Sequence, residues 1–354
     1  MEMTNFFDVI LSPWAQAKFG HTIAAGYVTG ALFVLAVSAW YMLKGRDLEF
    51  AKRSFRVAAA FGLIVSIFTI HLGDESGYLV AKDQPAKMAA MEAAWETVPA
   101  PAPMTIFGLP EENQVTRANV EIPWLFGIIA TRSLDTPIPG IKDLIEQNTQ
   151  RIQNGIVAMQ TLTALRKDPD NAALREQFSA VKDDLGYGML LRKYTEDPSR
   201  ATPEMIAQAA QDTIPGVNIM FWSFRAMVGC GIALLLVFAF GLYYSAKDLI
   251  PSRRWLLKAS FLALPLPWIA CELGWMVAEY GRQPWSIYEI LPVHLSTSTL
   301  SVGSVMGSLI GFVLLYSALL VVEMWLMIKL IKTGPSFLGT GRYFFERNRL
   351  NDKE

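Results

Sequence analysis

The chain has 354 residues, of which 52% are hydrophobic and 18% charged, and its mean hydropathy is +0.30. This composition is too apolar for an ordinary soluble domain and too charged for a uniform bundle of membrane helices. A net charge of -1 gives no sign of nucleic-acid binding. The two cysteines, Cys230 and Cys271, lie in apolar runs, where neither a disulfide framework nor a thiolate metal site is expected.

Five apolar segments are long enough to cross a bilayer, since a helix rises about 1.5 Å per residue and the hydrocarbon core is roughly 30 Å thick. They are 21–43, 57–73, 221–246, 259–281 and 302–328. The predicted fold is therefore all-α: a polytopic helical membrane protein with five transmembrane helices and one large helical extracytoplasmic loop domain.

Lysine and arginine gather after the first, third and fifth of these segments, and cytoplasmic loops carry such an excess. The predicted order is an extracytoplasmic N-terminal segment 1–20, a transmembrane hairpin 21–73, a periplasmic hydrophilic loop 74–215, three transmembrane helices 216–331 and a cytoplasmic tail 332–354. The first span must then enter from outside, yet no apolar or basic leader precedes it. We expect an even number of further spans ahead of Met1; a short translocated amino terminus is the alternative.

Helical signals also run through the hydrophilic loop. Apolar residues at near-helical spacing over 141–166 predict a helix that ends at the Asp168-Pro169 turn, and Thr202-Pro203 predicts an N-cap followed by the first helical residue. A shorter helical stretch over 81–96 carries Lys87 and Glu92. Taken alone, such a charged pair is more often a solvated helix face than a functional site.

His21 opens the first span among small residues, Gly20, Gly26 and Gly30. Small residues beside a histidine leave a groove in which a planar macrocycle could lie, and a neutral imidazole is a ready iron ligand. The same pattern is equally compatible with close helix packing around an interfacial histidine.

Arg225 stands two residues before Met227 in the outer part of the third span. An arginine there can neutralise a carboxylate such as a haem propionate, and a thioether can supply the second axial bond of an iron. A lone methionine in a membrane helix is far more often a packing residue.

In the fourth span Trp268, Glu272, Trp275 and Glu279 follow one another at i, i+4, i+7 and i+11 and so share one helix face. Carboxylates at membrane depth are costly and are candidates for function. This face could line a cofactor or a proton path, or form a structural network with arginines of neighbouring helices. Glu323 in the fifth span poses the same question.

At these residues the chain resembles a known family. The stretches KFGHT at 18–22, GYVTG at 26–30, GDESGY at 73–78 and GRQPW at 281–285 are similar to cytochrome bd-type quinol oxidase subunit I. The resemblance extends from about residue 6 into the tail at 341–343.

The resemblance implies the ligands of two haems. His21 and Met227 match the axial ligands of the low-spin haem b, with Arg225 beside it. Glu272 matches the acidic ligand of the high-spin haem b, and Trp268 lies at the position that helps couple the high-spin haems.

The remaining implications concern substrate and setting. Lys87 and Glu92 match the pair of the periplasmic Q-loop at which quinol is oxidised. The complete complex would carry haem d besides the two haems b, and would oxidise ubiquinol or menaquinol and reduce O2 to water. It would lie in a bacterial inner membrane with a second subunit, subunit II, and small accessory subunits.

The family's subunit begins with four more transmembrane helices, which hold the histidine ligand of the third haem. None is present in the 354 residues, so we expect the C-terminal part of such a subunit: a fragment, a split gene product or a chain with a misplaced start codon. We do not expect it to complete the oxygen site alone. Two other functions remain open, a low-spin haem and quinol electron-transfer subunit without oxygen chemistry, and a haem-free proton or cation transporter.

Overall fold

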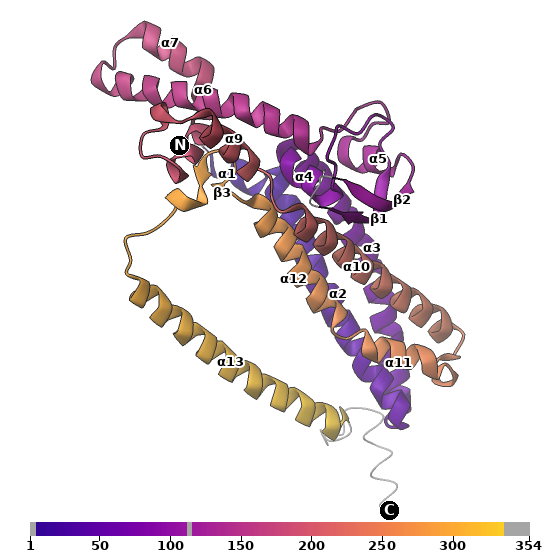
Figure 1. The fold of residues 1–354 in the computed structure, drawn as a ribbon. Helices are drawn as coiled ribbons and strands as arrows, with labels where there is room; N and C mark the ends of the chain where they lie inside the picture. Colours follow the sequence, from indigo (N-terminus) through magenta and orange to yellow (C-terminus); the bar gives the residue numbers. More distant parts are fainter. Residues whose placement is uncertain (1–4, 112–114, 336–354) are drawn as a thin grey trace, which may run out of the picture. The chain divides into compact units, whose positions relative to one another are not determined.

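A computed structural model describes residues 5–111 and 115–335 of the chain. Within these residues, five segments are long and apolar enough to cross a membrane: Pro13–Lys44, Leu48–Asp83, Pro203–Ala246, Arg254–Arg282 and Val302–Thr333 (Figure 1). Each contains one of the five spans predicted from the sequence. Most of the predicted tail, from residue 336 on, lies outside the described residues.

The described chain is mainly helical and has little sheet, which confirms the predicted fold class (Figure 1). Its α-helices are α1 Phe6–Ile10, α2 Pro13–Lys44, α3 Leu48–Asp83, α4 Pro85–Glu92, α5 Leu125–Thr131, α6 Ile141–Lys167, α7 Ala172–Val181, α8 Leu185–Leu190, α9 Pro203–Asp212, α10 Val217–Ala246, α11 Arg254–Leu262, α12 Leu266–Glu279 and α13 Val302–Thr333. Two short antiparallel hairpins accompany them, β1 Met104–Pro110 with β2 Thr116–Ile122 and β3 Trp285–Ile287 with β4 Leu291–Pro292.

The chain forms two compact units. Unit 1 comprises Met1–Ile23, Phe68–Gly231 and Trp268–Thr297, and unit 2 comprises Ala24–Ile67, Ile232–Pro267 and the remainder from Ser298. Every residue that the sequence analysis assigned to a haem or to quinol lies in unit 1.

Two helices of the hydrophilic loop lie where the sequence predicts, whereas the stretch predicted over 81–96 contains the end of α3 at Asp83 and the separate helix α4, Pro85–Glu92. Helix α6 spans Ile141–Lys167, and the Thr202 hydroxyl caps α9 by accepting a hydrogen bond from the Met205 amide. Proline occupies the first position of α9, where its missing N–H costs nothing. These helices pack around a core that includes Ile152, Leu191 and Trp285.

The hairpin β1–β2 was not foreseen. Residues Met104 and Ile122 pair at one end of it and Pro110 and Thr116 at the other. Strand β1 contains threonine, isoleucine and phenylalanine, and β2 contains threonine, valine and isoleucine; such residues fit a pleated surface better than a helix. One backbone carbonyl of β1, that of Thr105, faces the candidate site.

Unit 2 is held by close packing of membrane helices. The Phe238 ring of α10 lies against Gly62 of α3, where no side chain intervenes, and Phe55 packs against Gly241 in the same way. At one end of this pair Arg56 donates to the Ser245 carbonyl at 2.8 Å and forms an ion pair with Asp248 at 2.5 Å.

The fourth span is interrupted, whereas the sequence analysis treated it as one continuous helix. Helix α11 ends at Leu262 and α12 begins at Leu266. Pro265 and Pro267 lie at this junction, and a proline removes a backbone donor and clashes with the preceding turn. The break separates α11 in unit 2 from the acidic face of α12, which belongs almost wholly to unit 1.

Candidate functional site

Helix α4 is a short helix in which every residue after Pro85 is buried. Its alanines leave room for close packing, and two of its buried residues are charged: Lys87 is 5% exposed and Glu92 is 7% exposed. Lysine and glutamate are almost never so buried unless they have partners. The surroundings of these two side chains therefore define the candidate site.

Glu92 is partnered by Arg225 of α10. The Arg225 Nη2 lies 3.0 Å from Glu92 Oε2, and the same guanidinium donates to the carbonyls of Met91 at 2.7 Å and Thr105 at 2.5 Å. It also covers the Phe221 ring, 3.4 Å from the centroid. Burial raises the pKa of Glu92 to about 7, although the positive charge of Arg225 opposes the rise. This carboxyl can therefore gain and lose a proton near neutral pH.

Lys87 lies against a different part of the unit. Its Nζ donates to the Ala278 carbonyl at the end of α12, 3.1 Å away, and its stem packs on Gly281. Burial lowers the pKa of Lys87 to about 8, and the positive charges of Lys18 and Arg282 act in the same direction while Glu279 opposes them. The ammonium is thus poorly hydrated, and among the described residues its hydrogen bond is to this carbonyl.

His21 of α2 faces Gly73 of α3. A methyl group at Gly73 would lie 3.4 Å from the imidazole Cε1, so the glycine makes room for the ring. The His21 Nδ1 is buried and has no hydrogen-bond partner among the described residues. A buried polar atom without a partner calls for an explanation, and an imidazole nitrogen left free in this way is suited to an iron.

Met227 lies two residues beyond Arg225 on α10, and its thioether sulfur faces Gly274 of α12, 3.1 Å from where a methyl group would stand. His21 thus belongs to the α2–α3 pair and Met227 to the α10–α12 pair. Both are donors of the kind that a six-coordinate haem iron takes. The donor set fits a low-spin haem.

The acidic face of α12 is built differently. Trp268 is 48% exposed and Trp275 64% exposed, and Glu272 is exposed between them. Glu279, the last residue of the helix, pairs with Arg282 three residues further along the same segment. The predicted shared face is therefore present, but this pair is local and does not join α12 to an arginine of a neighbouring helix, as the packing hypothesis requires.

Two surface hollows lie near α4. One, of about 230 Å³, is lined by residues that include Tyr78, Lys82, Met88 and Thr131. The other, of about 260 Å³, is lined by residues that include Trp95 and Val217. Neither is lined by Lys87 or Glu92, so we base the site on the buried charges and not on these hollows.

The sequence analysis missed the partners that bury these charges. The Ala278 and Thr105 carbonyls leave no side-chain signature, and the ion pair between Glu279 and Arg282 was not assigned. The described residues contain no group of three His, Cys, Asp or Glu side chains placed to hold a metal ion, and Cys230 and Cys271 are free thiols.

Comparison with known proteins finds the same family throughout. Residues 1–335 match the family model described as cytochrome bd terminal oxidase subunit I. The chain is 45% identical to the cytochrome bd-II ubiquinol oxidase subunit 1 of Escherichia coli K12 over 337 residues, covering 95% of the chain and 66% of that relative. It is 26% identical to the cytochrome bd ubiquinol oxidase subunit 1 of Bacillus subtilis 168 over 335 residues, covering 94% and 60%.

The fold has a solved counterpart. The bd oxidase of Geobacillus thermodenitrificans superposes with a TM-score of 0.62 at 23% identity, over 94% of this chain and 61% of that one. The chain spans two thirds or less of the length of the curated relatives that it matches. With the match to the family model over nearly its whole length, the chain belongs to the cytochrome bd terminal oxidase subunit I family and is a multi-pass inner-membrane protein.

Proposed function

We propose that the chain is a haem-carrying, quinol-oxidising part of a bd-type terminal oxidase, in which electrons from quinol reduce O2 to water. The observation that carries this proposal is the pair of buried, oppositely charged side chains on α4, each held by a named partner. Burial of charge is costly. A helix that keeps two such groups beside a redox family's ligand positions is suited to proton-coupled chemistry.

Quinol oxidation releases two electrons and two protons for each quinone formed. The Glu92 carboxylate, with a pKa near 7, accepts a proton from a quinol hydroxyl, and the Lys87 ammonium donates a hydrogen bond to a quinol oxygen. The second proton leaves to water at the outer face. Arg225 stabilises the charged form of Glu92, so that the proton acceptor is present before quinol binds.

The electron acceptors are haems, which supply one-electron redox chemistry when bound. His21 and Met227 would hold a low-spin haem b, with Arg225 beside it, although both Nη atoms of Arg225 are already engaged by Glu92, Met91 and Thr105. Glu272 would hold a high-spin haem b and Trp268 would lie beside it, and haem d belongs to the complete complex. The exposed Glu272 and Trp268 are free to meet such a group.

The orientation follows from the basic residues. Lysine and arginine concentrate in the segments that follow the first, third and fifth spans, and such an excess is typical of cytoplasmic segments. The tail therefore lies in the cytoplasm, and the loop 74–215 lies in the periplasm. The partners are subunit II, small accessory subunits, membrane lipid and O2. The E. coli relative is named as a ubiquinol oxidase, which favours ubiquinol as the substrate over menaquinol.

The test separates the oxidation of quinol from the later transfer of electrons between the haems. In the oxidase complex that contains this chain, Lys87→Ala and Glu92→Ala should each lower the rate of ubiquinol oxidation by about 100-fold, the usual contribution of a positioned acid or base. An artificial one-electron donor should still reduce the haems at the normal rate. Equal loss with both donors would contradict a quinol site and indicate misfolding of the loop.

A further inference from the structure

Apart from the Ala278 carbonyl that binds Lys87, the segment 278–292, which contains the GRQPW stretch, has no part in the function proposed above. It runs from the end of α12 through the 3-10 turn Tyr280–Arg282 into the hairpin β3–β4. Its first residues form a wall for Lys87, since the Ala278 carbonyl accepts the ammonium hydrogen bond. A methyl group at Gly281 would lie 2.9 Å from the Lys87 Cε, so the wall touches the side chain directly.

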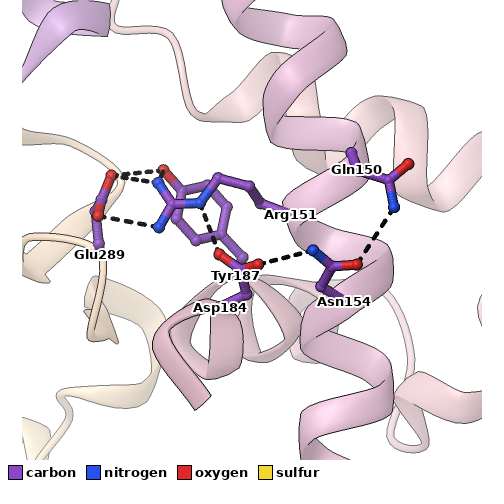
Figure 2. Close-up of polar contacts among 6 residues, drawn as sticks. All are labelled: Gln150, Arg151, Asn154, Asp184, Tyr187 and Glu289. Carbon is purple, nitrogen blue, oxygen red and sulfur yellow. Dashed lines mark hydrogen bonds and ion pairs between the residues drawn. The ribbon is translucent and has the colours of Figure 1, made fainter. Parts of the chain in front are cut away.

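The far end of the same segment is held by Arg151 of α6 (Figure 2). Two nitrogens of Arg151 donate to Glu289, Nη1 to Oε1 at 2.6 Å and Nη2 to Oε2 at 3.1 Å. The third, Nε, donates to Asp184 at 2.7 Å. Asn154 donates to the other oxygen of Asp184 at 2.9 Å, so this carboxylate is fixed from two sides (Figure 2). All three donor directions of the guanidinium are used, a geometry that lysine cannot reproduce.

Aromatic side chains add further contacts between Arg151 and the segment 278–292. The Arg151 guanidinium lies 4.0 Å from the centroid of the Tyr187 ring, and the Tyr187 hydroxyl donates to Glu289 at 2.9 Å. Tyr187 in turn packs against Trp285, which is 2% exposed, with centroids 5.1 Å apart. Gly186 approaches the backbone of Glu289 so closely that no side chain would fit there. The hairpin is therefore held both by ion pairs and by packing. We call the ion pairs of Arg151 with Asp184 and Glu289 the clamp.

We propose that Arg151, with Asp184 and Glu289, is a positioning residue that holds the segment 278–292 against Lys87 and thereby places the Lys87 ammonium in the quinol site. This inference rests on the function proposed above. Arg151 acts on Lys87 through the backbone of this segment. It binds Glu289, and the chain leads back from Glu289 through Trp285 to the turn that carries Gly281, which lies against Lys87.

Loss of the clamp should change Lys87 in a specific way. The low hydration of the ammonium depends on the Ala278–Gly281 wall, and the charges that face it are those of Lys18, Arg282 and Glu279. A loosened wall admits water to the ammonium, which raises the pKa of Lys87 from about 8 toward its ordinary value. Displacement of a substrate-binding group by a fraction of an ångström weakens binding without abolishing the fold.

The experiment uses the oxidase complex with Arg151→Gln, and we expect about a tenfold rise in KM for ubiquinol, as misplacement of a positioning group produces. The alkaline limb of the pH profile of kcat/KM should move to higher pH. Arg151→Lys should recover little, because lysine keeps the positive charge but lacks the planar set of N–H donors that binds Asp184 and Glu289 together. The matched control is Arg175→Gln on α7, which removes an exposed ion pair with Asp170 and should change neither quantity.

A second variant reaches Lys87 without touching the clamp. Gly281→Ala introduces a methyl group 2.5 Å from the Met220 Cε and 2.9 and 3.1 Å from the Lys87 Cε and Cγ, so these two side chains must shift while the backbone around them can stay in place. It should reproduce the raised KM and the shifted alkaline limb. In a Lys87→Ala background, Arg151→Gln should add no further loss.

The outcomes separate the inference from the proposed function. If Lys87→Ala leaves ubiquinol oxidation unchanged, the quinol site itself is wrong. If Lys87→Ala impairs oxidation but Arg151→Gln leaves KM and the alkaline limb unchanged, only the positioning role is overturned. Additive losses in the Lys87→Ala/Arg151→Gln double variant would also overturn it, because Arg151 would then act independently of Lys87.

Discussion

Helices α4 and α12 both carry acidic side chains in unit 1, but what surrounds those side chains differs. On α4, Glu92 is 7% exposed and meets an arginine that also binds two carbonyls. On α12, Glu272 is exposed between two exposed indoles. The first carboxylate is paired within the chain, whereas the second is exposed between two exposed tryptophans.

This difference shows that acidic residues in or near membrane helices are not one class. A buried and partnered carboxylate has a raised pKa and a fixed position, which suits proton transfer. An exposed carboxylate at membrane depth is costly unless it meets water, a cofactor or another polar group. The predictions below test whether α4 and α12 really serve these separate purposes.

The largest expected effect concerns haem binding in the complete oxidase. His21→Ala should abolish the absorbance of the low-spin haem, because it removes the imidazole ligand, and Met227→Leu should leave a bound haem with an altered, five-coordinate spectrum. Glu272→Gln on the exposed α12 face should leave the low-spin signal intact. Reduced-minus-oxidised difference spectra measure all three. Unchanged spectra in both His21→Ala and Met227→Leu would refute the assignment.

The next effect is on stability. Arg225→Leu leaves the Glu92 charge buried without its partner, and breaking a buried pair in this way costs about 3–5 kcal/mol in free energy of unfolding. Denaturant titration of the solubilised protein measures it. The double variant Arg225→Leu/Glu92→Leu should recover most of the loss, since no unpaired charge remains. An equal loss in the double variant would show that packing, and not the ion pair, stabilises α4.

A smaller effect appears in the pH dependence of ubiquinol oxidation. Activity should rise with pH as Glu92 ionises near pH 7 and fall as Lys87 loses its proton near pH 8, which gives a bell-shaped profile of kcat/KM. The groups that face Glu92 and Lys87 are Arg225 on one side and Lys18, Arg282 and Glu279 on the other. Glu92→Gln should remove the acid limb. An acid limb that persists in Glu92→Gln belongs to another group.

The smallest effect is expected at the exposed face of α12. Trp275→Phe should change the free energy of unfolding by no more than about 0.5 kcal/mol, since the side chain is 64% exposed and surface substitutions seldom cost more. Thermal unfolding followed by fluorescence measures this difference between the variant and the unmodified protein. A loss of several kcal/mol would mean that this face is packed in the folded protein, and the contrast with α4 would disappear.

Much of the fold could be read from local patterns. The five spans, the helix over 141–167 and the cap at Thr202 depend on composition and spacing within one segment, and the structure has all of them. The break before α12 could also have been anticipated, because Pro265 and Pro267 stand two residues apart in the sequence. The hairpin β1–β2 was harder, since its strands are short and half exposed.

The candidate site was only partly readable. Lys87 and Glu92 were singled out through a resemblance, since on their own they look like a solvated helix face. Their burial depends on Ala278, Gly281 and Arg225, which are more than 130 residues away in the chain. Nothing in the local sequence of α4 signals these neighbours.

The sequence by itself determined where the long apolar segments lie, where α6 and α9 begin, and which residues have the chemistry of iron ligands or proton acceptors. These properties depend on side-chain type and on periods of a few residues. Only the tertiary structure decided that Glu92 is paired and Glu272 exposed, and that Arg151 holds the wall of Lys87 through Glu289. Burial and hydrogen bonding join residues far apart in the chain, and backbone carbonyls, which every residue carries, take part in both.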